Sequence, residues 1–246
     1  MKLDATTLDY LKGRKFSNSL NVTIDYNQPI PDRIRFLAEL SKGKRILHLG
    51  CLDHLPLIDA KVAKRQWLHK ELTEAASQCL GIDINREAMD YVKEKYGLDN
   101  VLLRDITGPV IPEISDKTWD FAILGELLEH IDNPVSYLRE IRQKYQHAIE
   151  KIILTVPNVL TEQSFAAARR SSELINSDHR YWFSPYTIAK VMLQAGMELD
   201  EIFFANRIKL SFTGLVRKKL ITLSGGTPKY GFNYAGSIVA VGRMKS

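Results

Sequence analysis

Short apolar runs alternate with longer stretches of helical periodicity along most of this chain, and this alternation restricts the fold more than any other feature. Buried strands are short apolar runs bounded by turn residues, whereas helices repeat their apolar positions every three or four residues. The runs that fit the strand pattern are Arg45–Leu49, Cys79–Ile82, Val101–Leu103, Trp119–Leu124, Lys151–Val156, Met197–Phe204 and Gly236–Val241. Helices are expected at about 55–76, 86–96, 126–148, 161–173 and Pro185–Ala195.

The order strand, helix, strand, helix predicts a parallel sheet that is covered by helices on both faces. No long helix is evident between the last two strands, which favours a hairpin and therefore an antiparallel last strand. The expected fold class is a doubly wound α/β fold with a seven-stranded, mostly parallel sheet. Ligands of such sheets bind at the carboxyl ends of the strands.

Length and composition are compatible with a single domain over residues 1–246. Residues 1–31 are expected to form an N-terminal arm, and Asp32 is expected to cap a helix that follows it. The net charge of +5 permits an acidic ligand, but it is not the clustered basic stripe typical of nucleic-acid binding. Cys51 and Cys79 cannot form a disulfide framework, and no apolar run is long enough for a membrane span, so a cytoplasmic location is expected.

Small and acidic residues follow the first three predicted strands. Gly50 lets the backbone approach a ligand, although the full G-x-G-x-x-G pattern is absent. Asp83 could accept hydrogen bonds from both hydroxyls of a ribose, or it could cap the next helix. Asp105 could accept from an exocyclic amine such as that of adenine, while Ile106 packs on the ring.

The fourth strand is followed by Gly-Glu-Leu-Leu-Glu-His-Ile-Asp-Asn-Pro at 125–134, and the fifth ends in Val-Pro-Asn at 156–158. Together with Ser-Asp-His-Arg-Tyr-Trp-Phe-Ser-Pro at 177–185, these segments resemble class I S-adenosylmethionine-dependent methyltransferases. Within that class they are similar to the branch with a G-E-x-L-E-H-I-x-N-P segment. The resemblance covers residues 32–204 and 236–242, and it implies a Rossmann-like three-layer sandwich.

The resemblance also implies a cofactor and the residues that bind it. S-adenosyl-L-methionine would be bound and S-adenosyl-L-homocysteine released, with Asp83 at the ribose and Asp105 with Ile106 at the adenine. The turn after the first strand and the Gly125–Glu126 turn would face the methionine part. The expected cofactor-binding residues are Leu49, Gly50, Cys51, Asp83, Ile84, Asp105, Ile106, Gly125 and Glu126.

Three side chains are candidates for the chemistry itself: His130, His179 and Glu126. Either imidazole could remove a proton from a hydroxyl acceptor near neutral pH, or it could serve only to fix the local structure. Alternatively, Glu126, Glu129, His130 and His179 could bind one divalent metal ion. Some relatives with the Glu-x-x-Glu-His pattern, such as RNA 3′-end 2′-O-methyltransferases, use a metal there, although the expectation for this chain is no metal.

The expected function is O-methylation of a small-molecule or sugar/glycan hydroxyl. A metal-assisted RNA methyltransferase and a non-catalytic binding or scaffold protein of the same fold are the alternatives. Residues 205–235 are expected to form a basic insertion between the last two strands. Its segment 207–229 could cover an acidic or lipid-linked acceptor near a membrane surface, or it could be a solvated loop.

Overall fold

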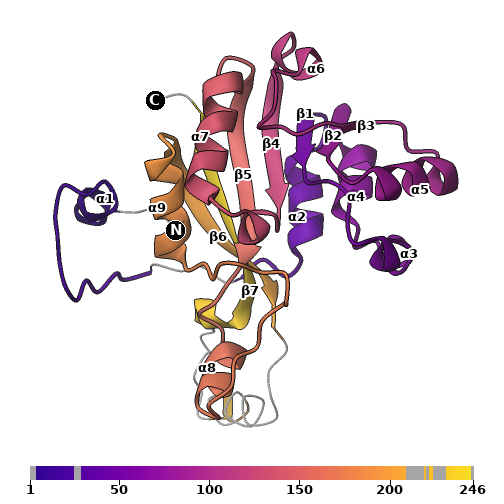
Figure 1. Cartoon of the computed structure of the whole chain (residues 1–246). Coiled ribbons are helices and arrows are strands. Elements are labelled where there is room, and N and C mark those ends of the chain that lie inside the picture. Colours follow the sequence, from indigo (N-terminus) through magenta and orange to yellow (C-terminus); the bar gives the residue numbers. More distant parts are fainter. Residues whose placement is uncertain (1–3, 25–28, 209–218, 220–221, 224–230, 245–246) are drawn as a thin grey trace.

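The computed structural model describes residues 4–24, 29–208, 219, 222–223 and 231–244. Within these residues, seven strands form one sheet in the order β3-β2-β1-β4-β5-β7-β6 (Figure 1). Only β7 runs antiparallel to its neighbours β5 and β6, which confirms the predicted α/β fold class. The strands are β1 (Arg45–Leu49), β2 (Gln78–Asp83), β3 (Val101–Leu103), β4 (Trp119–Gly125), β5 (Ile149–Pro157), β6 (Glu198–Arg207) and β7 (Ala235–Arg243).

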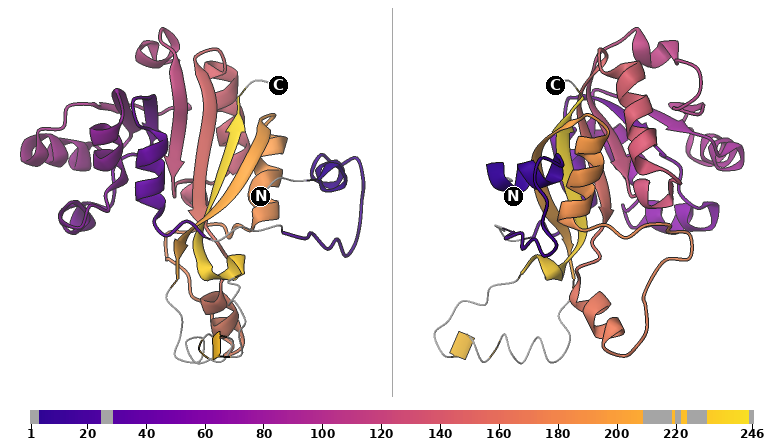
Figure 2. Two further views of the ribbon diagram at one scale, coloured as in Figure 1. Left: turned by 180° about the vertical axis from the view of Figure 1, so that it is seen from behind. Right: turned by 60° about the vertical axis from the view of Figure 1, so that its left-hand side comes forward.

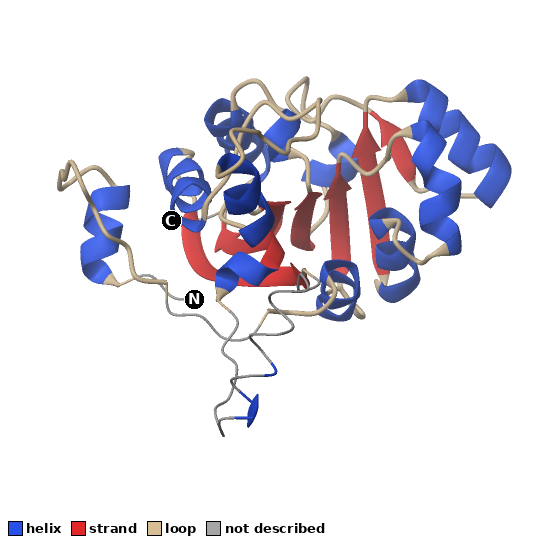
Figure 3. Cartoon of the chain, turned by 90° about the horizontal axis from the view of Figure 1, so that it is seen from below, coloured by secondary structure: helices blue, strands red, loops and turns tan. Residues whose placement is uncertain are grey.

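Helices cover both faces of the sheet, as the view from below shows (Figure 3). Apolar side chains of α7 and α9, such as Leu138 and Ile188, pack on one face, and Leu37 of α2 and Leu72 of α4 pack on the other. The helices are α1 (Ala5–Leu11), α2 (Arg33–Leu40), α3 (Leu55–Ala63), α4 (Leu68–Ala75), α5 (Arg86–Tyr96), α6 (Pro112–Ser115), α7 (Pro134–Tyr145), α8 (Glu162–Ala168) and α9 (Pro185–Gln194). Single 3-10 turns lie at Leu128–His130 and Phe232–Tyr234.

The first crossover is two helices rather than the single helix predicted over 55–76. Arg65 has a left-handed backbone (φ +54°) that ends the α3 segment, and the chain then inserts Trp67 into the interior. The Trp67 side chain is only 2% exposed, and its Nε1 donates to the carbonyl of Cys51 at 3.2 Å. The buried Trp67 side chain therefore supports the turn after β1 through its hydrogen bond to Cys51.

The helix predicted over 126–148 also begins later than expected, because Pro134 is its first residue. Proline fits the first turn of a helix but restricts the residue before it, and Asn133 caps α7 by accepting from the amide of Ser136 at 3.0 Å. The seven residues between β4 and Asn133 therefore form an irregular turn. That turn carries Glu126, Glu129 and His130.

Near the N-terminus, the arm predicted for residues 1–31 contains the short helix α1, which lies beside α9 (Figures 1 and 2). Leu11 is fully buried, and Lys190 Nζ donates to the carbonyl of Tyr10 at 2.9 Å. The cap predicted for the next helix is confirmed, since Asp32 Oδ1 accepts from the amide of Arg35 at 3.0 Å. Most of the predicted basic insertion lies outside the described residues.

Candidate active site

One cavity of about 850 Å³ lies at the carboxyl ends of β1, β2 and β4. This volume falls within the range of small-molecule sites. Residues from several strand ends and from the loop after α8 line it together. The sequence-predicted residues that line it are Leu49, Gly50, Cys51, Asp83, Ile84, Asp105, Ile106, Gly125, Glu126, Glu129, His130 and His179.

The turn after β1 needs glycine for both conformation and space. Gly50 has φ +66°, and a Cβ atom at this position would lie 2.7 Å from Leu127 Cδ1. Two residues later, the amide of Leu52 donates to Asp83 Oδ2 at 2.8 Å. The ends of β1 and β2 are therefore joined directly at the cavity wall.

Asp83 does not cap α5, so that alternative for Asp83 is wrong. Asn85 is the cap and accepts from the amide of Ala88 at 3.1 Å. The other oxygen of Asp83, Oδ1, accepts from the amides of Ile84 at 2.8 Å and Asn85 at 3.0 Å. A carboxylate offers about four acceptor sites, so roughly one site remains for a ligand.

The wall beside β3 combines an acidic and an apolar surface. Asp105 Oδ1 accepts from the amide and the hydroxyl of Thr107, at 2.8 and 2.7 Å, while Ile106 is 4% exposed. Tyr137 of α7, which the sequence analysis missed, also lines the cavity. Burial raises the pKa of its hydroxyl, and the charges of Asp105 and Asp83 raise that pKa further.

Glu126 begins the irregular turn after β4 with a left-handed backbone (φ +56°). Its carboxylate is held on both sides: Arg33 Nη2 lies 3.2 Å from Oε2, and Ser237 Oγ donates to Oε1 at 2.8 Å. Sequence reasoning missed Arg33 and Ser237, because they lie far from Glu126 in the chain. No local pattern indicates such contacts.

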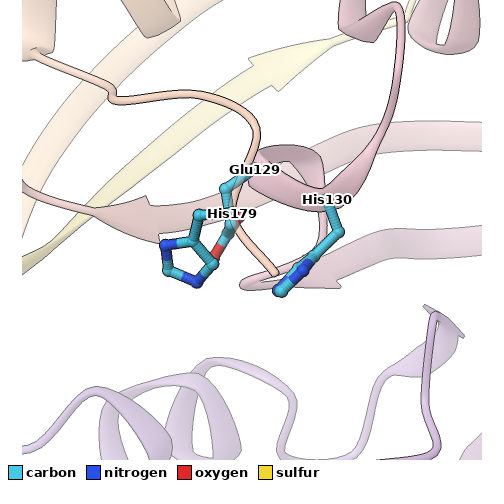
Figure 4. A group of neighbouring side chains, drawn as sticks. All are labelled: Glu129, His130 and His179. Atoms are coloured by element: carbon cyan, nitrogen blue, oxygen red, sulfur yellow. The ribbon is translucent and has the colours of Figure 1, made fainter. Parts of the chain in front are cut away.

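Three of the four candidate metal ligands come together at the same end of the cavity (Figure 4). Ligand atoms of Glu129, His130 and His179 lie within 4.8 Å of one another, whereas Glu126 lies outside this group. The rings of His130 and His179 meet edge to face, with centroids 4.8 Å apart. The cavity therefore has a carboxylate and two imidazoles facing one small region.

Glu129 is fully buried, and neither of its carboxylate oxygens has a hydrogen-bond partner among the described residues. Burial raises the pKa of this carboxyl to about 8, and the charge of Glu126 contributes in the same direction. A buried, unpartnered carboxylate of this kind usually has a ligand, a proton or an ion to satisfy it.

His130 is oriented by the loop that follows α8. Its Nδ1 lies 3.1 Å from the carbonyl oxygen of Asp178, so Nδ1 must carry the proton and Nε2 the lone pair when the ring is neutral. Two hydrogen bonds anchor this loop on the turn that follows β4. The amide of Arg180 donates to the carbonyl of Glu129 at 2.7 Å, and the hydroxyl of Tyr181 donates to the carbonyl of Asp132 at 2.5 Å. Burial, followed by the neighbouring His130, lowers the pKa of His179.

A second histidine pair joins β1 to α4 beside the cavity, and it was also missed. His48 lines the cavity, and its Nδ1 lies 3.3 Å from Nδ1 of His69 in α4. Both rings are almost completely buried, and burial lowers both pKa values, that of His69 to about 4. Both imidazoles are therefore neutral at physiological pH.

The class of protein follows from this fold and from the family comparison. A seven-stranded sheet of this order, with a ligand cavity at the ends of β1, β2 and β4, is the architecture of class I methyltransferases. The model of a methyltransferase-domain family matches residues 24–202, so the chain belongs to that family. This match confirms the predicted class, an S-adenosylmethionine-dependent methyltransferase.

Solved structures agree on the fold. A SAM-dependent methyltransferase from Archaeoglobus fulgidus is 17% identical, with a TM-score of 0.54 over 86% of this chain and 91% of that chain. Magnesium protoporphyrin IX methyltransferase from Synechocystis, crystallised with SAH, is 13% identical, with a TM-score of 0.52 over 87% of this chain and 82% of that chain. A search of curated protein sequences gave no match. Among the described residues, no helix has the length and apolarity to cross a membrane.

Proposed function

We propose that this chain transfers the methyl group of S-adenosylmethionine to a hydroxyl oxygen of a small molecule or a glycan. The observation that carries the proposal is the orientation of His130: its Nδ1 is held by the carbonyl of Asp178, which leaves Nε2 as a base in the cavity. A hydroxyl acceptor must lose its proton, and imidazole is the side chain best suited to accept it near neutral pH.

The cavity suits the cofactor in its chemistry. Asp83 retains about one acceptor site for a ribose hydroxyl, and Asp105 has an oxygen, Oδ2, to which no described residue donates. Ile106 lines the cavity and would contact the adenine ring. The turns at Gly50 and Gly125 would hold the methionine part. When bound there, S-adenosylmethionine supplies a methyl group that its sulfonium has already activated.

In the proposed step, His130 Nε2 takes the hydroxyl proton while the oxygen–methyl bond forms and the sulfur–methyl bond breaks. The products are a methyl ether, S-adenosylhomocysteine and an imidazolium that later releases its proton to water. His179 meets the ring of His130 edge to face and would position the acceptor beside it. Holding the reactants in line supplies much of the rate acceleration.

The acceptor side of the proposal rests on the basic segment 207–229, which we assign to an acidic or lipid-linked acceptor. Cytoplasmic location and peripheral contact of this segment with a membrane remain parts of the same proposal. The net charge of +5 is modest and does not by itself indicate nucleic-acid binding, which typically shows as a clustered basic stripe. A steep loss of acceptor binding as salt rises would instead favour a nucleic acid.

Calorimetry with S-adenosylhomocysteine tests the proposal first. Binding at micromolar affinity or tighter is expected, followed by radiolabel transfer from S-adenosylmethionine to hydroxylated acceptors but not to their deoxy or O-methylated analogues. Absence of binding would favour the alternative of a non-catalytic scaffold protein. Transfer to an amine in preference to a hydroxyl would contradict the O-methylation assignment.

A metal-assisted reaction is the second candidate, and one observation favours it: Glu129, His130 and His179 are close enough to share an ion, and both oxygens of Glu129 lack partners. Carboxylate and imidazole ligands suit a divalent cation, which would lower the pKa of an acceptor hydroxyl. Loss of activity in a chelator and recovery with a divalent ion would establish this reaction. Full activity in excess chelator would exclude it and leave the imidazoles as bases.

A further inference from the structure

The backbone of Glu126 is strained, and the contacts around it explain how the strain is maintained. A φ of +56° lies in the left-handed region that residues with a Cβ atom rarely adopt. The amide of Glu126 donates to both the carbonyl and the hydroxyl of Thr155, at 2.9 and 3.1 Å. Its side chain is 34% exposed, yet each carboxylate oxygen has a partner.

Those partners belong to a closed ring of hydrogen bonds. Arg33 Nη2 and Ser237 Oγ hold Glu126, and Asn206 joins these two residues: its Oδ1 accepts from the amide of Arg33 at 2.9 Å, and its Nδ2 donates to Ser237 Oγ at 3.0 Å. Arg33 Nη1 also donates to Thr155 Oγ1 at 2.8 Å. The ring thus connects α2, β5, β6 and β7 to the end of β4.

The two residues that hold the Glu126 carboxylate are buried. Arg33 is 7% exposed and Ser237 is 2% exposed, so their bonds to Glu126 are formed in a region of low dielectric. Hydrogen bonds to charged groups are strong there, and loss of one partner leaves a buried group unsatisfied. The arrangement is therefore rigid rather than an exchangeable surface ion pair.

The position of this ring determines where the proposed base lies. Only three residues separate Glu126 from His130, which is the last residue of the single 3-10 turn Leu128–His130. The direction in which the chain leaves Glu126 therefore sets the location of Glu129 and His130. A change of φ at Glu126 from the left-handed to an ordinary region would turn this segment away from the cavity.

We infer that Arg33 and Ser237 are positioning residues for methyl transfer, which act on His130 through the left-handed backbone of Glu126. On this reading, Glu126 acts as an anchor of the turn and does not exchange a proton with the substrate. The inference rests on the proposed function, because it takes His130 as the base. It assigns to the β6–β7 end of the sheet a role in catalysis that residue spacing did not indicate.

Ser237→Ala and Arg33→Lys are the test variants, since each removes contacts of the ring with little loss of volume. The imidazole ¹⁵N resonances of His130 and the affinity for S-adenosylhomocysteine should be measured, together with kcat and KM once an acceptor is in hand. We expect shifted His130 resonances and a kcat reduced at least tenfold, with a smaller reduction of cofactor affinity, because Glu126 also lies in the turn assigned to the methionine part. Arg243→Lys, which alters the ion pairs at the other end of β7, is the matched control. It should leave the His130 resonances, the affinity for S-adenosylhomocysteine, kcat and KM unchanged.

Glu126→Gly separates positioning from a general loss of structure, because glycine adopts the left-handed conformation without strain. Ser237→Ala should shift the His130 resonances in the wild-type background but not in the Glu126→Gly background. An equal shift in both backgrounds would mean that Ser237 does not act through Glu126, and unshifted resonances with normal kcat in both test variants would also overturn the inference. Absence of cofactor binding in the wild type would instead refute the proposed function.

Discussion

At the scale of single residues, one backbone contact decides which chemistry His130 can perform. The carbonyl of Asp178 fixes the proton of the neutral imidazole on Nδ1, so the lone pair is on Nε2. We therefore expect His130→Ala to lower kcat about a hundredfold or more, the usual scale for loss of a general base. Affinity for S-adenosylhomocysteine should change little, because the imidazole acts on the acceptor.

His179→Ala provides the comparison for His130. His179 lies in the loop after α8 and contacts His130 only through the ring edge, so its loss should raise KM as well as lower kcat. Steady-state kinetics with a hydroxyl acceptor distinguish the two patterns. Near-normal kcat in His130→Ala would show that His130 has only a structural role, and the base would then have to be His179 or absent.

The buried His69 predicts how stability depends on pH. Burial lowers its pKa to about 4, whereas an unfolded chain titrates near 6.5. Between these values the unfolded state binds more protons, so the free energy of unfolding falls as pH decreases from about 6.5 to 4, by up to about 1.4 kcal/mol per pH unit. His69→Gln should therefore lose less stability than the wild type between pH 7 and 4.5 in urea titrations.

The exposed His147 is the matched control for this pH dependence, because solvent surrounds its imidazole. His147→Gln should show the same fall in stability with pH as the wild type. If His69→Gln also kept the wild-type slope, His69 would not be the group responsible. Reversibility at each pH should be checked, since the comparison requires equilibrium values.

The sequence predicted the residues of the cavity wall better than the residues that support them. Gly50, Asp83 and Asp105 could be recognised because each follows a strand that the apolar pattern marks. Arg33 and Ser237 could not, because they reach Glu126 from α2 and β7, far away in the chain. Side-chain networks of this kind are set by tertiary packing, which local patterns do not encode.

At the scale of elements, the strand pattern was predicted closely, and the errors concern helix boundaries. Helical spacing continues across residues 55–76, yet the chain breaks at Arg65 so that Trp67 can fill the space beneath Cys51. Burial of a large aromatic side chain outweighs the local helix propensity of such a short stretch. A functional turn likewise replaces the first part of the helix predicted at 126–148.

Packing of α4 against β2 gives a prediction for Gly81. A Cβ atom there would lie 2.6 Å from Cys51 Sγ and 2.8 Å from His69 Cε1, closer than real contacts allow. Gly81→Ala should therefore destabilise the protein by about 1–3 kcal/mol, the usual cost of overpacking a core. Chemical denaturation at pH 7 measures this change directly.

Gly236→Ala, at the start of β7, is the matched control for Gly81. Its new methyl group would lie 3.4 Å from the carbonyl oxygen of Asn206, so the expected cost is well below that of Gly81→Ala. Equal stability changes in the two variants would indicate that α4 moves freely away from β2. The tight contact between these elements would then be unnecessary for folding.

At the scale of the whole molecule, the parallel sheet explains why distant residues share one cavity. The carboxyl ends of β1, β2 and β4 lie at the same edge of the sheet, so the residues that follow these strands meet there (Figure 1). Alternation of strands and helices is enough to predict this meeting. It does not predict the acceptor.

Binding of the cofactor should stabilise the molecule as a whole, and Asp83 should control how much. A ligand at a hundred times its Kd raises the free energy of unfolding by about 2.7 kcal/mol, which corresponds to a Tm increase of about 5–10 °C for a chain of this size. Asp83→Ala should weaken S-adenosylhomocysteine at least tenfold, because a hydrogen bond between a charged group and a ribose hydroxyl is lost.

At the same ligand concentration, the stabilisation of Asp83→Ala should therefore fall to about half, since a tenfold loss of affinity is about 1.4 kcal/mol. Differential scanning calorimetry with and without ligand isolates this effect from the stability lost when the Leu52 amide loses its acceptor. Asp90→Ala, an exposed position on α5, is the control and should keep the full ligand-induced Tm increase. If Asp83→Ala also kept the full ligand-induced Tm increase, the ribose would have to lie elsewhere in the cavity. The expected placement of the cofactor at the end of β2 would then be wrong.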